Sequence, residues 1–284
     1  MAGIVGVSRG VISLFTRAPA FLARFGATYF GAFRHHAARF DDKVGLEVGG
    51  PSAIFRNFSA LPVYRRARRI DGVNFSATTM WEGRIAEGMT YRYARGKVGR
   101  QFIGEASDLA MIPTGTYDFL ISSHALEHCA NALQTLTEWR RVVQPGGDLL
   151  LVVPRSQDTF DHRRPVTTFE HLLEDAARGI DESDLTHLEE IVELHDLTRD
   201  IPGLTLEVFR ERSLKNFENR GLHHHVFDED LLRQMFEHLN ISTVFVDYAR
   251  PVHLIIMGRI NEARVGDPVT PGYSRAAATL PATK

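Results

Sequence analysis

Apolar and polar positions alternate in blocks between residues 43 and 154. Continuous apolar runs at residues 44–48, 117–122 and 149–153 predict buried strands, and shorter runs at 69–71 and 101–104 predict two more. Leu133, Leu136 and Trp139 begin a set of apolar residues at helical spacing, which predicts a helix that ends at the Pro-Gly-Gly sequence 145–147. A second helix is expected to start at Pro51, with Ile54, Phe55 and Phe58 on its apolar face. This alternation predicts a parallel sheet with helices on both faces.

The remainder of the chain changes character after residue 154. Residues 155–222 are polar and acid-rich and read mostly as helices, at 169–178 and 184–197, while Asp228 is the expected N-cap of a further helix. The last apolar runs, 241–246 and 252–257, are too close for a helical crossover, so they should pair antiparallel. We therefore predict an α/β fold: a Rossmann-like, doubly wound, mostly parallel sheet with an antiparallel final strand and a helical insertion after the fifth strand.

Both ends of the chain differ from this central domain, which we place at residues 41–260, with a helical lid insertion at about 155–222. Residues 1–40 hold five arginines and no acidic residue, and their apolar residues suggest short amphipathic helices. We interpret this segment as an extension that covers the core; a membrane-surface segment and an organellar transit peptide are the alternatives. Residues 261–284 are rich in Pro, Ala, Thr and Gly and are expected to be flexible.

Composition narrows the classes of function. The chain carries 33 basic and 35 acidic residues, which gives no general electrostatic reason for binding nucleic acid. No apolar stretch is long enough to span a bilayer. The single cysteine, Cys129, excludes an intramolecular disulfide and fits a cytoplasmic protein.

The end of the first predicted strand is a candidate ligand site. Gly49 and Gly50 let the backbone approach a ligand closely, but Pro51 and Ala53 stand where a dinucleotide fingerprint needs glycine. An enzyme using NAD or FAD is therefore disfavoured. Asp71, at the end of the second predicted strand, is placed to accept the two hydroxyls of a ribose, or else is a turn residue before Gly72.

An ordered set of motifs between residues 104 and 154 carries a family resemblance. The motifs are Gly104-Glu105-Ala106, Tyr117-Asp118-Phe119, Ser122-Ser123-His124-Ala125-Leu126-Glu127-His128, and Trp139 to Leu149. With them, residues 44–260 resemble the class I S-adenosylmethionine-dependent methyltransferases, in particular the small-molecule branch. The resemblance implies S-adenosylmethionine as cofactor.

The same resemblance implies roles by position. Glu47, Gly49 and Gly50 would face the methionine end of the cofactor, Asp71 its ribose, and Glu105 and Ala106 its adenine. Ser122 would lie with the cofactor-binding residues, and His124 beside it, where methyl donor and acceptor meet. Pro51 and Ala53 depart from the glycines that many relatives keep.

A hydroxyl acceptor would need a base, and the chain has 13 histidines. The loop after the fifth strand begins where ligands bind in open α/β sheets, so His162 is the first candidate base and His124 the second. Arg163 and Arg164 would hold an anionic acceptor, unless they only fix the insertion by ion pairs, and His224 would line the acceptor pocket.

These observations predict a methyltransferase acting on a small molecule, such as a sugar or another hydroxyl- or amine-bearing metabolite. O-methylation is the leading hypothesis, because of the many candidate bases, and N-methylation is the alternative. Two alternatives remain: a cofactor-binding protein without catalysis, and a metal-dependent hydrolase. The second would use His187, Glu190 and His195 on one helix face, although a solvated face gives the same pattern and we predict no metal ligands.

Overall fold

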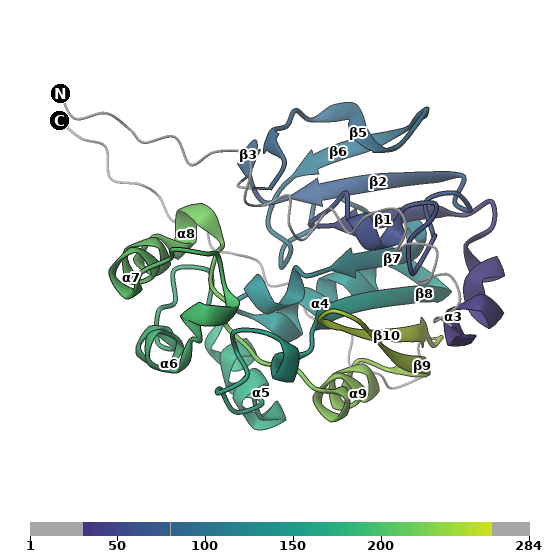
Figure 1. Cartoon of the computed structure of the whole chain (residues 1–284). Helices are drawn as coiled ribbons and strands as arrows, with labels where there is room; N and C mark the ends of the chain where they lie inside the picture. The colour runs from purple at the N-terminus through teal and green to yellow at the C-terminus, as the bar shows by residue number, and fades with distance from the viewer. Residues whose placement is uncertain (1–30, 80, 263–284) are drawn as a thin grey trace, which may run out of the picture.

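The computed structural model of the protein describes residues 31–79 and 81–262. Its centre is an eight-stranded sheet with the order β5-β6-β2-β1-β7-β8-β10-β9 (Figure 1). The strands are β1 (Val44–Val48), β2 (Arg69–Asn74), β5 (Gly88–Ala94), β6 (Lys97–Ile103), β7 (Tyr117–Ser123), β8 (Val143–Pro154), β9 (Ile241–Ala249) and β10 (His253–Ile260). A separate small hairpin consists of β3 (Thr78–Thr79) and β4 (Gly83–Arg84).

The pairing confirms the predicted fold class. β6, β2, β1, β7 and β8 are parallel, and β10 lies antiparallel to both β8 and β9. The sequence pattern missed β5, which adds a second antiparallel pair at the other edge of the sheet. Its residues alternate between exposed and buried and form no apolar run.

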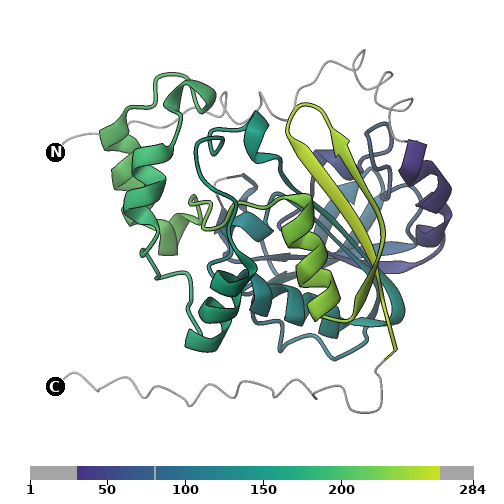
Figure 2. The ribbon, with the colours of Figure 1, turned by 90° about the horizontal axis from the view of Figure 1, so that it is seen from below.

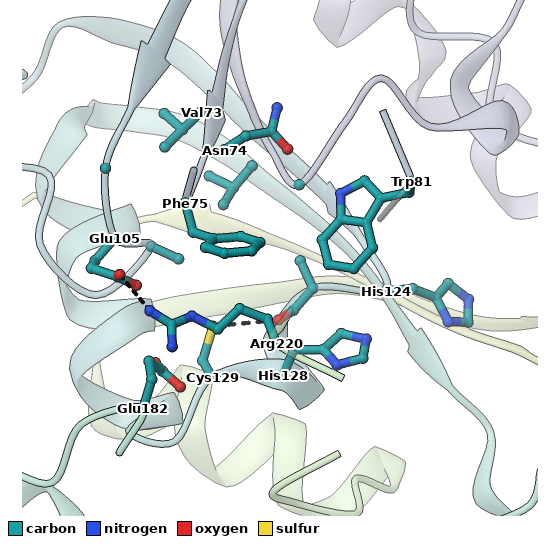
Figure 3. Close-up of a pocket in the computed structure, with 15 residues that line it drawn as sticks. Val73, Asn74, Phe75, Trp81, Glu105, His124, His128, Cys129, Glu182 and Arg220 are labelled. Atoms are coloured by element: carbon teal, nitrogen blue, oxygen red, sulfur yellow. Dashed lines mark hydrogen bonds and ion pairs between the residues drawn. The ribbon is translucent and has the colours of Figure 1, made fainter. Parts of the chain in front are cut away.

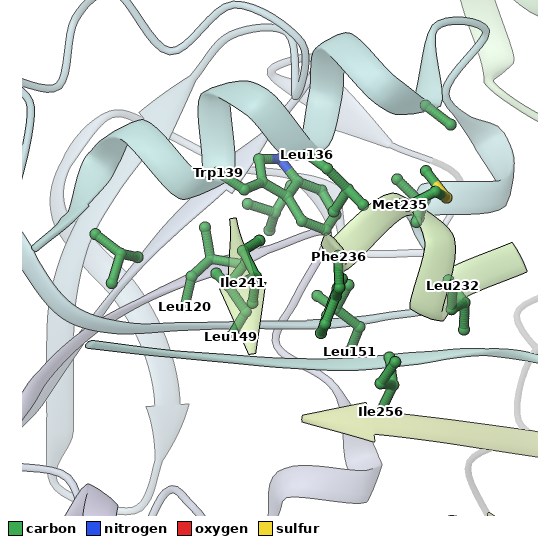
Figure 4. Packing of buried hydrophobic residues seen from close by; sticks show 14 of the residues in the cluster. Leu120, Leu136, Trp139, Leu149, Leu151, Leu232, Met235, Phe236, Ile241 and Ile256 are labelled. Carbon is green, nitrogen blue, oxygen red and sulfur yellow. The ribbon is translucent and has the colours of Figure 1, made fainter. Parts of the chain in front are cut away.

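One face of the sheet is covered by helices, as predicted. These are α4 (Ala132–Val142) and α9 (Glu229–His238), with α5 (Phe169–Arg178) packed beside them. Asp228 caps α9 by accepting a hydrogen bond from the Leu231 N–H at 2.8 Å. Figure 4 shows Leu136 and Trp139 of α4 meeting Phe236 of α9 above the strands.

The opposite face differs from the prediction. The helix expected after Pro51 is absent from the described chain: only a single 3-10 turn, Ala53–Phe55, forms there, and Phe58 is 81% exposed. An irregular segment, residues 51–68, instead buries Phe55 and Tyr64 against the sheet. The short α3 (Gly31–His36) and a 3-10 turn over Ala37–Phe40 complete this layer.

This layer fixes the start of the described chain to the sheet. The Arg39 guanidinium donates two hydrogen bonds, of 2.6 and 3.0 Å, to the Asp148 carboxylate in β8. Phe40 is fully buried and packs edge-on against Phe119. Residues 31–40, the described part of the predicted N-terminal extension, therefore pack against the sheet. The amphipathic helices predicted before them, and most of the predicted tail, lie outside the described residues.

The insertion after β8 is helical, as expected. It contains α5, α6 (Leu188–Leu194), α7 (Leu206–Leu214) and α8 (Asn216–Asn219). α6, α7 and α8 form a group beside the sheet (Figure 2) with its own small apolar cluster around Ile191 and Phe209. None of the helices in the described ranges is long and apolar enough to cross a membrane.

The apolar contact between α4 and the sheet should dominate stability. Leu136 is fully buried in the main core cluster. We expect Leu136→Ala to lower the free energy of unfolding by about 2–5 kcal/mol, because it leaves a cavity. Leu214→Ala, at a position that is 53% exposed, should change it by less than about 0.5 kcal/mol. Denaturant unfolding measures both, and equal losses would contradict this account of the core.

Candidate active site

A pocket lies at the carboxyl ends of the parallel strands, where open α/β sheets bind ligands. It is a cavity of about 520 Å³, part of it open to solvent. Its walls come from the ends of β1, β2, β6 and β7, the β3–β4 hairpin and the insertion (Figure 3). The lining residues are Val48, Gly49, Val73, Asn74, Phe75, Trp81, Gly104, Glu105, Ala106, His124, Ala125, His128, Cys129, Glu182 and Arg220.

The floor of the pocket is the turn that follows β1. Gly49 lines the cavity with φ of +81°, and a Cβ there would lie 2.8 Å from the Ala125 Cβ. Gly50 is required for a different reason, because a Cβ on it would overlap the Glu47 carboxylate and the Tyr91 hydroxyl. The backbone can therefore approach a ligand at Gly49, as predicted, whereas Gly50 lies outside the lining.

The Glu47 side chain lies behind this turn and does not face the pocket. It is fully buried and accepts hydrogen bonds from the Tyr64 hydroxyl at 2.7 Å, the Tyr91 hydroxyl at 2.6 Å and the Ser52 N–H at 2.9 Å. Burial raises the pKa of Glu47, although these hydrogen bonds favour the charged form. The role predicted for it was contact with the methionine end of a cofactor, but its side chain is not among the lining residues and instead holds the turn in shape.

The polar residue at the end of β2 is Asn74, not Asp71. Asp71 lies in mid-strand and is 3% exposed; it accepts hydrogen bonds from the Tyr117 hydroxyl and the Arg100 N–H. Asn74 donates from its amide to Gly50 O at 3.1 Å, while its Oδ1 is buried without a hydrogen-bond partner among the described residues. β2 is longer than its apolar run suggested, and it ends at Asn74, three residues after the predicted end at Asp71.

The next wall is formed by the turn after β6. Glu105 and Ala106, for which the resemblance implies contact with adenine, both line the pocket. The Glu105 carboxylate accepts a 2.5 Å hydrogen bond from Arg220, whose guanidinium lies 5.1 Å from the Phe75 ring. In Figure 3 Arg220 extends between Phe75 and Glu182. Glu105 thus already has a partner in the described structure.

Two histidines from the turn after β7 line the pocket, and their surroundings differ. His124, with φ of +52°, has Nε2 at 2.8 Å from His253 Nδ1 and Nδ1 at 3.4 Å from the buried Glu127 carboxylate. Both its nitrogens therefore face other side chains. His128 donates from Nδ1 to Leu222 O at 2.9 Å, which leaves the Nε2 lone pair free.

Burial and the neighbouring His223 lower the pKa of His128 to about 4, so its imidazole is neutral at pH 7. Its ring stacks on Trp81 with 6.2 Å between ring centres. Glu127 Oε1 lies 4.0 Å from His128 Nε2 and is 1% exposed. Burial would raise the pKa of Glu127, but His124, His128 and His223 outweigh it and keep the carboxyl ionised.

The predicted acceptor residues do not reach this pocket. His162 Nε2 lies 2.8 Å from Asp196 Oδ2, and Arg163 also contacts Asp196, at 3.4 Å. Arg164 is buried between Asp161, Glu190 and the carbonyls of residues 223 and 224. The alternative that these charges fix the insertion by ion pairs is the one the structure shows.

His224 and Ser122 are likewise outside the lining. His224 is 2% exposed and its Nε2 lies 3.0 Å from the Asn216 amide. Ser122 donates its hydroxyl proton to Val48 O at 3.1 Å and so joins β7 to β1. Both were predicted from their place after a strand or before a helix, which does not specify the direction of a side chain.

The residues that the sequence reasoning missed are Asn74, Trp81, Glu182 and Arg220, together with His128 as a candidate base. His128 was quoted as part of a motif, and its distance of one helical turn from His124 was the available signal. Trp81 and Arg220 belong to a hairpin and an irregular segment, and no sequence pattern connects them to the strand ends.

Comparisons with known proteins agree with this description. Residues 57–151 match the family described as Methyltransferase domain. No curated protein matches the chain. Among solved structures, the chain is similar to a putative S-adenosylmethionine-dependent methyltransferase from Listeria monocytogenes, with 14% identity over 81% of this chain and 96% of that one, and a TM-score of 0.45.

Two further structures are similar at the same level. An S-adenosylmethionine-dependent methyltransferase from Mesorhizobium loti has 12% identity over 80% of this chain and 95% of that one, with a TM-score of 0.46. The 1,6-didemethyltoxoflavin-N1-methyltransferase of Burkholderia thailandensis has 14% identity over 88% and 87%, with a TM-score of 0.44.

The sheet order defines a Rossmann-like α/β fold, with a candidate active site at the carboxyl ends of its parallel strands. Residues 57–151, about a third of the chain, match a methyltransferase domain, and this match supports S-adenosylmethionine as the cofactor. The residues present fit that cofactor: Gly49 leaves space that a side chain would fill, and Asn74 Oδ1 is a buried acceptor for a ligand hydroxyl.

Cofactor binding can be tested with S-adenosylhomocysteine. At about 100 times its dissociation constant it should add about 2.7 kcal/mol of stability, which raises Tm by roughly 5–10 °C. Asn74→Ala should reduce this ligand-induced rise, whereas Asp71→Asn should retain it. Thermal unfolding with and without ligand measures the rise for each variant; the reverse order would restore Asp71 as the cofactor-binding residue.

A second prediction concerns Glu182, which lines the pocket and is 6% exposed. Burial raises the pKa of Glu182 from 4.5 to about 7. The folded protein therefore binds this proton more tightly than the unfolded chain does. The resulting stabilisation is complete below pH 4.5 and is lost as the pH rises through 7. The stability of Glu182→Gln relative to wild type should therefore increase by about 3 kcal/mol over that interval. Urea unfolding at several pH values measures it, with exposed Glu218→Gln as the control; a constant difference would contradict the raised pKa.

Proposed function

We propose that this protein is an S-adenosylmethionine-dependent methyltransferase that acts on a small molecule, and that its acceptor atom is a hydroxyl oxygen. The observation that carries the proposal is His128, a neutral imidazole in the pocket wall with Nδ1–H committed to Leu222 O and Nε2 left as a proton acceptor. A fixed tautomer of this kind suits a general base.

The surroundings of His128 support that role. When Nε2 takes up a proton, the ionised Glu127 carboxylate 4.0 Å away stabilises the resulting charge. Trp81 holds the ring plane from the other side. His124, whose two nitrogens already face His253 and Glu127, is better placed to orient Glu127 than to take a proton from an acceptor.

The shape of the pocket supports a small acceptor. Trp81 from the hairpin, and Glu182 and Arg220 from the insertion, complete its walls beyond the strand ends. Phe75 and Trp81, with ring centres 6.0 Å apart, provide an apolar surface for a planar or apolar acceptor. When bound, S-adenosylmethionine supplies the electrophilic methyl group; the chain orients the acceptor, excludes water and accepts the proton.

The base is tested by His128→Gln, which keeps a polar side chain but removes the basic nitrogen. We expect kcat to fall by about 10²–10⁴-fold while the Tm rise caused by S-adenosylhomocysteine is retained. The exposed His238→Gln is the matched control and should leave kcat unchanged. An unaltered kcat in His128→Gln would exclude this residue as the base.

The acceptor class is tested with a panel of hydroxyl-, amine- and carboxylate-bearing metabolites, using release of S-adenosylhomocysteine as the signal. Turnover of hydroxyl compounds that depends on His128 supports the proposal. Turnover of amine compounds alone would replace O-methylation by N-methylation. Ligand binding without turnover on any acceptor would favour the cofactor-binding protein without catalysis.

A further inference from the structure

A second group of chemically active side chains lies in the insertion, outside the pocket lining. It comprises His171 and Asp175, one turn apart on α5, His187 directly before α6, and His225 in the segment between α8 and α9. One ligand atom from each of the four lies within 4.8 Å of all the others. Three segments of the chain thus bring three imidazoles and one carboxylate to a single point.

We propose that these four residues, the insertion cluster of His171, Asp175, His187 and His225, bind one zinc ion. The separations support a common centre: His171 Nε2 lies 3.0 Å from His187 Nε2 and 3.1 Å from Asp175 Oδ2. Ligand atoms about 2.0–2.1 Å from a tetrahedral zinc are ~3.3 Å apart. The His225 ring centre is 5.8 Å from the centres of both the His171 and the His187 rings.

Hydrogen bonds within the protein do not satisfy the cluster. The contact between His171 and His187 is one hydrogen bond. Asp175 Oδ2 has ion-pair contacts, 3.1 Å from His171 Nε2 and 3.6 Å from His225 Nε2, but neither it nor His225 Nδ1 has a hydrogen-bond partner among the described residues. Asp175 is 2% exposed and His225 is 1% exposed, so water does not replace the missing partners at the surface. Buried polar atoms without partners are rare and costly, and a bound cation would accept both lone pairs.

The hydrogen bond of His225 determines which of its two nitrogens could bind a metal. Its Nε2 lies 2.9 Å from Ala130 O, and since a carbonyl can only accept, Nε2 carries the proton. The lone pair is then on Nδ1, the atom without a partner. Metal-binding histidines commonly donate their other N–H to a carbonyl in this way, which fixes the ring and its tautomer.

The donor set selects the kind of ion. Three imidazoles and one carboxylate suit zinc and similar transition metals, whereas calcium and magnesium prefer sites made of oxygen. Four protein ligands complete a tetrahedron, which is typical of a structural and not a catalytic zinc site. The site differs from the one considered from the sequence: His187 belongs to it, but His195 pairs with Asp200, and Glu190 with Arg164.

The position of the cluster suggests what the ion would do. Two backbone groups of Ala130 connect the cluster to the pocket. Its carbonyl accepts a hydrogen bond from His225, and its N–H donates one to the Glu182 carboxylate at 3.0 Å. Glu182 lines the pocket, as does the adjacent Cys129. A zinc ion in the insertion cluster would therefore fix the insertion to the core and, through Ala130, hold one wall of the pocket.

The experiment uses the full chain, purified without metal-binding tags or chelators. We expect one zinc per chain by elemental analysis and, for protein stripped by a chelator, a Tm rise of roughly 5 °C or more when zinc is restored. His187→Gln should weaken zinc binding at least about 100-fold in competition with a chromogenic chelator. Absence of bound zinc, together with no Tm change on titration with zinc, would overturn the proposal.

Two controls separate this site from the alternatives. Glu127, His128 and His223 form the second group with ligand spacing, so His128→Gln should retain zinc; loss of zinc in that variant but not in His187→Gln would place the ion in the other group and refute the proposal. If His187→Gln does not fold, Co²⁺ is added to the stripped wild type. Intense visible absorption then indicates a tetrahedral site, and weak absorption typical of octahedral cobalt contradicts it.

Discussion

The burial of the Glu47 carboxylate at the centre of the sheet is the constraint on which the pocket depends. Two tyrosine hydroxyls and one backbone N–H surround it, and they come from β5 and from the irregular segment after β1. A buried carboxylate needs such partners because desolvation is costly. Its requirement forces Tyr64 and Tyr91 inward, leaves no room for a side chain at Gly50, and so determines the course of the turn that forms the floor of the pocket.

This constraint also explains which features the sequence could predict. The strands β1, β7 and β8 and the helices α4, α5 and α9 were predicted because each has its own apolar period and its own end signal, such as Asp228 before α9. The helix expected after β1 failed because the apolar residues that suggested it, Ile54 and Phe55, are used to cover the sheet from an irregular segment whose backbone is set by Glu47. The spacing of apolar residues along the chain does not reveal a buried carboxylate such as Glu47 that fixes the backbone through hydrogen bonds.

The candidate site was predictable only where backbone position decides contact. Gly49, Glu105 and Ala106 line the pocket because they follow strands directly. The functions of Asp71, His162 and Arg164 depended on the direction of side chains, and each is turned toward an internal ion pair or hydrogen bond. Arg220 and Trp81 enter from segments more than five residues from any predicted strand, so only the folded chain brings them to the strand ends.

The bidentate contact between Arg39 and Asp148 has a consequence for how the molecule can be presented to its surroundings. It fastens the 3-10 turn Ala37–Phe40, which directly follows α3, beside the end of the sheet that lies away from the pocket (Figure 1). A partner that held the protein through α3 would therefore contact the end of the sheet opposite the strand ends that line the pocket. Contacts made through α3 and ligand binding in the pocket would thus use opposite ends of the parallel strands (Figure 1).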